Sequence, residues 1–171
     1  MSTRYNHDHN PAPSTTRRPL VMTATQAPPE SVLPPHHAVF AEPLAVGVHA
    51  VDRADLPACA ALLPAPGTGT VSEAAPCAHR LLVVVAGAGP MGLCVAASAR
   101  RAFPDAYIVS LDRRPFKLDI AKKAGATEAL LVEAGANYSK AHNRIKELAG
   151  RRGGADVYFE VTGNPEAVMQ V

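Results

Sequence analysis

The chain has 171 residues, of which 47% are hydrophobic, and this allows one modest globular domain with irregular flanks. Its formal net charge of +2 is too small, and its arginine pairs too dispersed, to indicate binding of nucleic acid or of an anionic membrane surface. No apolar run approaches the roughly 20 residues that a membrane-spanning helix needs, so we expect no membrane partner.

The first 80 residues divide into three segments by composition. Residues 1–37 are rich in proline and polar residues without a helical or strand period, which predicts a disordered tail. Residues 38–55 form a linking segment, in which 39–54 predict an amphipathic helix with Pro43 in its first turn. Residues 56–80 mix proline, glycine, threonine and alanine without a period, and predict an irregular loop.

From residue 81 onward, apolar runs of strand length alternate with longer helical segments. The predicted strands cover residues 81–86, 106–111, 128–132 and 156–161, and the predicted helices cover residues 90–102, 115–124 and 139–148. Asn164 and Pro165 have the composition of an N-cap and first residue of a further helix. This alternation predicts the α/β class, with a Rossmann-type parallel sheet of about four strands and flanking helices over residues 81–171.

A glycine-rich turn follows the first predicted strand and opens the next helix. Gly87 permits a tight turn, Gly89 lets the backbone approach a pyrophosphate, and Gly92 lets the helix pack close to the sheet. The free N–H groups and the dipole of that helix favour an anion. Asp112 follows the last glycine by 20 residues, at the tip of the second strand, where a carboxylate can bind the adenosine ribose of a dinucleotide.

The identity of the nucleotide depends on Asp112 and its neighbours. The negative charge of Asp112 would repel the 2′-phosphate of NADP, which favours NAD, although Arg113 and Arg114 could accommodate that phosphate. Asp112 could instead cap the helix that begins at Pro115. A methyltransferase also uses a glycine-rich turn and an acidic ribose contact, and a non-catalytic nucleotide-binding or regulatory module would need no more than this turn. Both remain alternatives.

Four motifs in succession carry a resemblance to a known family. They are EPLAVGVHA from Glu42, AGAGPMGL from Ala86, AKKAGA from Ala121 and DVYFEVTG from Asp156. Together they resemble the medium-chain zinc-type alcohol dehydrogenases, especially the sorbitol, threonine and polyol dehydrogenase branch. The resemblance implies that the pyrophosphate is held by Gly87, Gly89, Pro90, Met91 and Gly92. It implies further that Asp112 and Lys117 bind the adenosine ribose and that Val161, Thr162 and Gly163 lie near the nicotinamide.

The family reaction is zinc-assisted hydride transfer between a secondary alcohol and NAD, in enzymes that are homo-oligomers. The Cys and His-Glu pair that hold the family's catalytic zinc have no counterpart in this chain. Glu42 matches a family glutamate beside the metal, but one carboxylate cannot hold zinc alone. We therefore expect no catalytic and no metal-binding residues. The chain is expected to be a fragment, inactive by itself, that meets an alcohol or polyol substrate only within a longer protein; its own oligomeric state stays open.

The three cysteines bear on the cellular compartment. Cys59, Cys77 and Cys94 are widely spaced and include no C-x-x-C pair, so they signal neither a disulfide framework nor a structural zinc site. This usage favours a reducing compartment, and we expect the protein in the cytoplasm.

Overall fold

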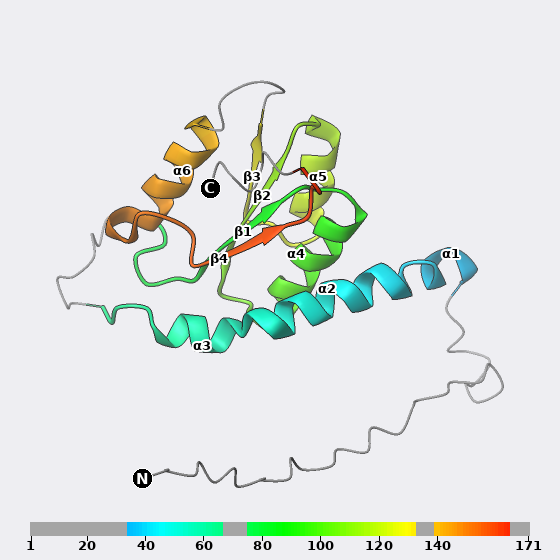
Figure 1. The fold of residues 1–171 in the computed structure, drawn as a ribbon, viewed down its shortest axis with the longest axis horizontal. Helices are drawn as coiled ribbons and strands as arrows, with labels where there is room; N and C mark the ends of the chain where they lie inside the picture. Colours follow the sequence, from blue (N-terminus) through cyan, green and yellow to red (C-terminus); the bar gives the residue numbers. More distant parts are fainter. Residues whose placement is uncertain (1–33, 67–74, 133–138, 165–171) are drawn as a thin grey trace, which may run out of the picture. The chain divides into compact units, whose positions relative to one another are not determined.

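The computed structural model describes residues 34–66, 75–132 and 139–164 (Figure 1). Within these residues, four strands form one parallel sheet: β1 (Leu82–Ala86), β2 (Tyr107–Asp112), β3 (Glu128–Leu131) and β4 (Val157–Glu160). The helices are α1 (Pro35–Ala38), α2 (Ala41–Ala54), α3 (Leu56–Ala61), α4 (Pro90–Ala102), α5 (Pro115–Lys123) and α6 (Ser139–Ala149), and a 3-10 turn, η2, spans Gly150–Arg152. The predicted α/β class with a four-stranded parallel sheet is confirmed.

Helices cover both faces of the sheet, and this explains the apolar composition of β1. Its sequence, LVVVA, is buried at all five positions, as expected for a central parallel strand. Val83, Val85 and Ile108 belong to the core on the side of α2, α4 and α5. Leu82 and Val84 belong to the core on the side of α6. Figure 1 shows α6 on the opposite side of the sheet from α4 and α5.

The strand order is β3-β2-β1-β4, so the chain reverses its direction of travel across the sheet between β3 and β4. β1 pairs with β2 on one side, where Ala86 lies opposite Leu111, and with β4 on the other, where Ala86 lies opposite Glu160. The crossover from β1 to β2 through α4 and the crossover from β3 to β4 through α6 therefore lie on different faces of the sheet. A crevice forms at such a switch point, and in open α/β sheets this is where ligands bind.

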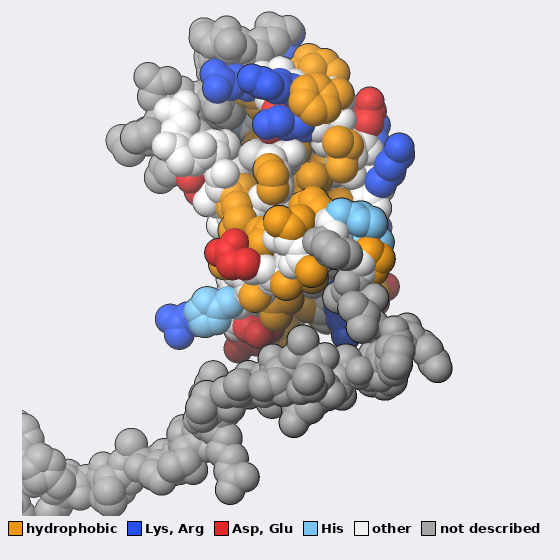
Figure 2. Space-filling model, turned by 90° about the vertical axis from the view of Figure 1, so that its right-hand side faces the viewer, with side chains coloured by type: hydrophobic (Ala, Val, Ile, Leu, Met, Phe, Trp, Pro, Cys, Tyr) orange, Lys and Arg blue, Asp and Glu red, His pale blue; other side chains and the backbone are white. Residues whose placement is uncertain are grey.

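Helix α2 crosses α4 at close range because Gly47 has no side chain. A Cβ atom at Gly47 would lie 2.8 Å from the carbonyl carbon of Cys94. The outward part of α2 and the residues just before it expose the apolar side chains of Val39, Phe40, Leu44, Val46 and Val48. Figure 2 shows hydrophobic side chains gathered on this face, which lies at the right of Figure 1. No helix among the described residues is long and apolar enough to cross a membrane.

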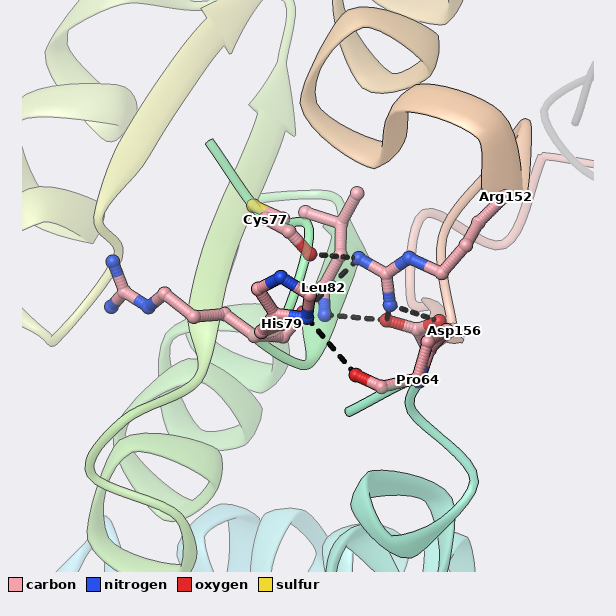
Figure 3. A network of polar contacts seen from close by, with 7 residues as sticks. Pro64, Cys77, His79, Leu82, Arg152 and Asp156 are labelled. Atoms are coloured by element: carbon pink, nitrogen blue, oxygen red, sulfur yellow. Dashed lines mark hydrogen bonds and ion pairs between the residues drawn. The ribbon is translucent and has the colours of Figure 1, made fainter. Parts of the chain in front are cut away.

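A polar network joins distant segments at the amino-terminal end of β1 (Figure 3). The guanidinium group of Arg152 donates hydrogen bonds to both carboxylate oxygens of Asp156, at 2.7 and 2.6 Å. It also donates to the carbonyl oxygens of Cys77 and, at 3.1 Å, of Arg80. The Asp156 carboxylate in turn accepts the N–H of Leu82 at 2.7 Å. The network ties the segment before β1 to the segment before β4.

The structure corrects the sequence prediction in the first half of the chain. Residues 56–61 form helix α3, so the predicted irregular loop is wrong there. Its start was missed because Asp55 adopts a left-handed conformation, with φ of 47°, and its carboxylate accepts the N–H of Ala58 at 3.2 Å. Pro35–Ala38 form α1, which overlaps the last three residues of the segment predicted as the tail. Residues 1–33 and Pro165 lie outside the described part of the chain, and the domain boundaries at residues 37, 55 and 80 stay predictions.

Candidate nucleotide-binding site

A cavity of about 330 Å³ opens at the carboxyl ends of β1, β2 and β4. Six of the residues predicted for the site line this cavity: Gly87, Gly89, Asp112, Lys117, Val161 and Thr162. The structure thus brings together the glycine turn, the tip of β2 and the loop after β4, which are distant in sequence. Their meeting place is the crevice that the strand order creates.

Backbone contacts fix the shape of the glycine turn. Gly87 has a φ of 105°, a conformation that other residues rarely adopt, and its N–H donates to the carbonyl oxygen of Leu111 at 2.8 Å. A Cβ atom at Gly92 would lie 1.8 Å from the carbonyl oxygen of Gly87. Gly92 is therefore needed so that the start of α4 can contact the turn. Both glycines shape the turn, and of the two only Gly87 lines the cavity.

Gly89 differs from Gly87 and Gly92 because none of the described residues requires a glycine there. Its φ of −75° suits any residue, and apart from its chain neighbours no atom of the described residues lies within 4 Å of the position a Cβ would take. Gly89 is the N-cap residue of α4, whose first N–H groups have no partner within the helix. The open space beside Gly89 lies at this positive end of the helix dipole and fits a phosphate group, which a side chain would displace.

The carboxylate of Asp112 is held in place by the glycine turn. Its Oδ2 atom accepts the N–H of Ala88 at 2.8 Å, and its Oδ1 atom accepts the N–H of Arg114 at 2.9 Å. The Lys117 Nζ atom lies 3.8 Å from Oδ2. A carboxylate has about four acceptor positions, so Asp112 can still accept hydrogen bonds from ribose hydroxyl groups. The N-cap residue of α5 is Arg114, so the alternative that Asp112 caps this helix is wrong.

The loop after β4 is organised by Glu160. Its carboxylate accepts the N–H of Thr162 at 2.7 Å, the hydroxyl group of Thr162, and the N–H of Gly163 at 3.3 Å. The hydrogen bond from the Thr162 hydroxyl, followed by the backbone hydrogen bonds, lowers the pKa of Glu160. The Thr162 Oγ1 atom also accepts the N–H of Asn164 at 3.0 Å. Glu160 therefore sets the course of a loop that lines the cavity.

Some predicted residues lie beside the cavity and others were missed. Pro90, Met91, Gly92 and Gly163 are outside the lining formed by the described residues. The lining also includes residues that were not predicted for the site: Ala86, Leu111, Arg113, Arg114, Val132 and Asn164. The two arginines could have been assigned from their place directly after Asp112. Val132 could not, because its contribution depends on the position of β3 in the sheet.

The described residues do not fit a zinc site. Among them, no three His, Cys, Asp or Glu side chains are grouped closely enough to hold a metal ion. Cys59, Cys77 and Cys94 are free thiols, and burial raises the pKa of Cys77 to about 11 and also raises that of Cys94. Glu42 is exposed on α2.

Comparison with known proteins agrees with this architecture. Residues 90–171 match the family described as "zinc-binding dehydrogenase". The erythritol/L-threitol dehydrogenase of Mycolicibacterium smegmatis is 37% identical over 138 residues, which cover 81% of this chain and 31% of that protein. The sorbitol dehydrogenase of Bacillus subtilis is 32% identical over 132 residues, covering 77% of this chain and 30% of that protein.

The chain thus spans about a third of the length of these two relatives. The crystal structure of the D-arabinose dehydrogenase from Sulfolobus solfataricus supports the fold. It superposes with a TM-score of 0.56 at 20% identity and covers 81% of this chain and 36% of that one. From the ordered motifs, the parallel sheet and these matches, we conclude that the chain belongs to the zinc-type medium-chain alcohol dehydrogenase family, of which it carries a partial domain.

Proposed function

We propose that the cavity at the carboxyl ends of β1, β2 and β4 binds NAD. The observation that carries this proposal is the open space beside Gly89, at the N-terminus of α4 and next to the carboxylate of Asp112. A pyrophosphate beside Gly89 would receive hydrogen bonds from the first N–H groups of α4. The ribose hydroxyl groups of the adenosine would donate to Asp112, beside Lys117.

The preference for NAD over NADP rests on the same carboxylate. A 2′-phosphate at the adenosine ribose would lie against the negative charge of Asp112 and lose the hydrogen bond that a hydroxyl group donates. Arg113 and Arg114 are exposed and line the cavity, so they are the residues that would offset this repulsion. Because the Asp112 carboxylate is fixed by two backbone N–H groups, it cannot swing away from a phosphate without breaking them.

The other half of the dinucleotide would lie over β4. Asp112 ends β2 on one side of β1, and Val161 and Thr162 follow β4 on the other side. A ligand whose adenosine lies at β2 and whose pyrophosphate lies beside Gly89 would therefore extend its nicotinamide toward this loop. Gly163 follows in the same loop and stays part of this proposal.

We propose further that the chain is the cofactor-binding portion of an alcohol or polyol dehydrogenase. When bound, NAD accepts a hydride from a secondary alcohol, and zinc in the family polarises the alcohol oxygen. This chain's own residues bind and orient the cofactor. Its sequence offers no Cys and His set for the metal, so the isolated chain should not oxidise alcohols. The three free thiols fit a reducing compartment such as the cytoplasm.

Isothermal titration calorimetry of the full 171-residue chain with NAD, NADP and S-adenosylmethionine tests the proposed ligand. NAD should bind more tightly than NADP. The Asp112→Ala variant should weaken NAD binding by about 1 to 3 kcal/mol, the scale for losing a charged hydrogen-bond partner. An Asp119→Asn variant on the exposed side of α5 is the matched control. A preference for S-adenosylmethionine would favour the methyltransferase alternative, and binding of none of the three ligands would refute a nucleotide site.

A separate assay tests the expected lack of activity. Purified chain with zinc and NAD should form no NADH from sorbitol, threonine or ethanol. If NAD binds without turnover, the chain can still be either a regulatory module or the cofactor-binding portion of a dehydrogenase. Adding the catalytic domain of a relative distinguishes these two functions, because only the second should then form NADH. Zinc-dependent NADH formation by the chain alone would overturn the proposal that it is inactive.

A further inference from the structure

The carboxylate of Glu160 spans the loop that follows β4 without lining the cavity itself. It accepts two hydrogen bonds from Thr162, one from the backbone N–H and one from the hydroxyl group, and a third from the N–H of Gly163. The hydroxyl oxygen of Thr162 accepts the N–H of Asn164 and so extends the chain of bonds by one residue. The Glu160 carboxylate and the Thr162 hydroxyl group together connect three consecutive residues of the loop.

This loop forms the wall of the cavity on the β4 side. Val161, Thr162 and Asn164 line the cavity, and the N–H of Val161 donates to the carbonyl oxygen of Ala86 at the end of β1. Thr162 and Gly163 are exposed, so packing against the core does not fix their backbone. Gly163 has a φ of 68°, a left-handed conformation that glycine adopts without strain but does not prefer over others. The hydrogen bonds to the carboxylate therefore favour one conformation of the exposed part of the loop.

We propose that Glu160 is a positioning residue for the nicotinamide half of the site, acting through Thr162 and Gly163. The inference rests on the proposed binding of NAD in this cavity. Glu160 holds the loop in the conformation that faces the cofactor. The loop therefore loses its conformational entropy when the chain folds, and binding of the ligand does not have to order it. Asp112 does the same for the adenosine half, because its carboxylate bonds the turn at Ala88. Each half of the site then has one carboxylate at a strand end that fixes a neighbouring loop.

The lowered pKa of Glu160 agrees with this arrangement, since three donors stabilise its charged form. A depressed pKa means that the contribution of the carboxylate is complete above its ordinary pKa of 4.5 and is lost as the pH falls through the lower value of the folded chain. At neutral pH the carboxylate is charged and the loop is held.

The first experiment tests the contact without any nucleotide. Proton–nitrogen correlation spectra of the full chain are recorded from pH 7 to pH 3. The amide signals of Thr162 and Gly163 should titrate with a midpoint below 4.5, the ordinary pKa of Glu160. This titration should vanish in the Glu160→Gln variant and persist in Glu147→Gln, a matched change on the exposed side of α6. Amide signals that do not follow the pH in the wild-type chain would overturn the inference at its first step.

The second experiment compares two ligands that differ in how much of the site they occupy. NAD reaches both halves, whereas AMP reaches only the adenosine half at Asp112 and the phosphate position beside Gly89. At pH 7, Glu160→Gln should weaken NAD about tenfold, as expected when bonds to a charged acceptor are lost. Its affinity for AMP should stay within about twofold, because the adenosine half is independent of the loop. Thr162→Val, which keeps the side-chain shape but removes the hydroxyl group, should show the same difference between the two ligands.

Conservative replacement separates positioning from a general structural role. Glu160→Asp keeps a carboxylate that can reach the N–H two residues ahead, so it should recover NAD affinity to within about threefold of wild type. Equal loss of NAD and AMP in Glu160→Gln would show a merely structural role, and unchanged NAD affinity would show no role at all. If wild-type chain binds no NAD although the amides titrate, the proposed function fails, and the positioning role fails with it while the loop contact stands.

Discussion

Gly89 and Gly92 lie three residues apart but have different roles. Alanine substitutions at the two positions should therefore separate effects on stability from effects on ligand binding. In Gly92→Ala the new methyl group would collide with the carbonyl oxygen of Gly87, which is backbone and cannot rotate away. We expect the free energy of unfolding, measured by urea denaturation, to fall by at least about 3 kcal/mol. A variant of wild-type stability would contradict the close contact between the turn and α4.

Gly89→Ala places the same group in open space. The backbone conformation at Gly89 suits alanine, so the free energy of unfolding should stay within about 1 kcal/mol of wild type. The methyl group would occupy the space assigned to the pyrophosphate. Calorimetry should therefore show NAD affinity reduced by at least about tenfold, or about 1.4 kcal/mol. Unchanged affinity would place the pyrophosphate elsewhere.

The buried thiol of Cys77 makes the stability of the chain depend on alkaline pH. Desolvation by burial raises its pKa from 9.0 to about 11. The thiol of the unfolded chain loses its proton at lower pH than the thiol of the folded chain, so the free energy of unfolding should fall as the pH rises from about 9 to 11. Urea denaturation at pH 8 and pH 10 measures this fall, which should be smaller in Cys77→Ala. An equal fall in both proteins would assign the effect to other groups.

At the scale of elements, substitution of Gly47 at the contact between α2 and α4 has two opposing effects on stability, one on helix propensity and one on packing. Gly47→Ala should favour the isolated helix by about 1 kcal/mol. The new Cβ, however, would meet the backbone of Cys94 at 2.8 Å, and overpacking of this kind typically costs about 1 to 3 kcal/mol. We expect packing to dominate, with a net loss of stability of roughly 1 kcal/mol in thermal or urea unfolding. Val46→Ala, at a half-exposed position of the same helix, is the control, and a stabilised Gly47→Ala would show that α2 can move away from α4 at little cost.

At the scale of the whole molecule, the two ends of the sheet have separate tasks. The Arg152 network closes the amino-terminal end of β1, and the cavity lies at the carboxyl ends of the strands. Arg152→Met would leave the carboxylate of Asp156 and the carbonyl of Cys77 without their cation. Because Arg152 and Asp156 are 13% and 17% exposed, we expect a loss of about 2 to 3 kcal/mol in unfolding free energy, below the full value for a buried pair.

NAD affinity should be unchanged in Arg152→Met at temperatures where the variant is folded, since the network contributes no atom to the cavity. Arg151→Met, at an exposed neighbouring position, should change neither quantity. A selective loss of NAD binding in Arg152→Met would show that the two ends of the sheet are coupled, contrary to this expectation.

The sequence by itself determined the alternation of strands and helices, the parallel sheet and the position of the glycine turn. These features are local: apolar runs, glycine spacing and helix-terminal residues lie within a few positions of one another. The helix predicted over residues 90–102 coincides with α4 for this reason. Helix α3 was missed although Asp55 and Pro57 are suitable N-cap and first-turn residues, because a helix of six residues is too short to show a helical period.

Only the tertiary structure decided how these elements meet. It placed β4 beside β1, which brings the loop held by Glu160 opposite Asp112 across one cavity. It also showed that a side chain would collide at Gly92 but not at Gly89, although both belong to one motif. Arg152 donates a hydrogen bond to the carbonyl oxygen of Cys77, 75 positions away in the sequence, and no local sequence pattern predicts this contact. The energies of such contacts depend on distances in space. The fold sets these distances, and the order of the residues in the chain does not.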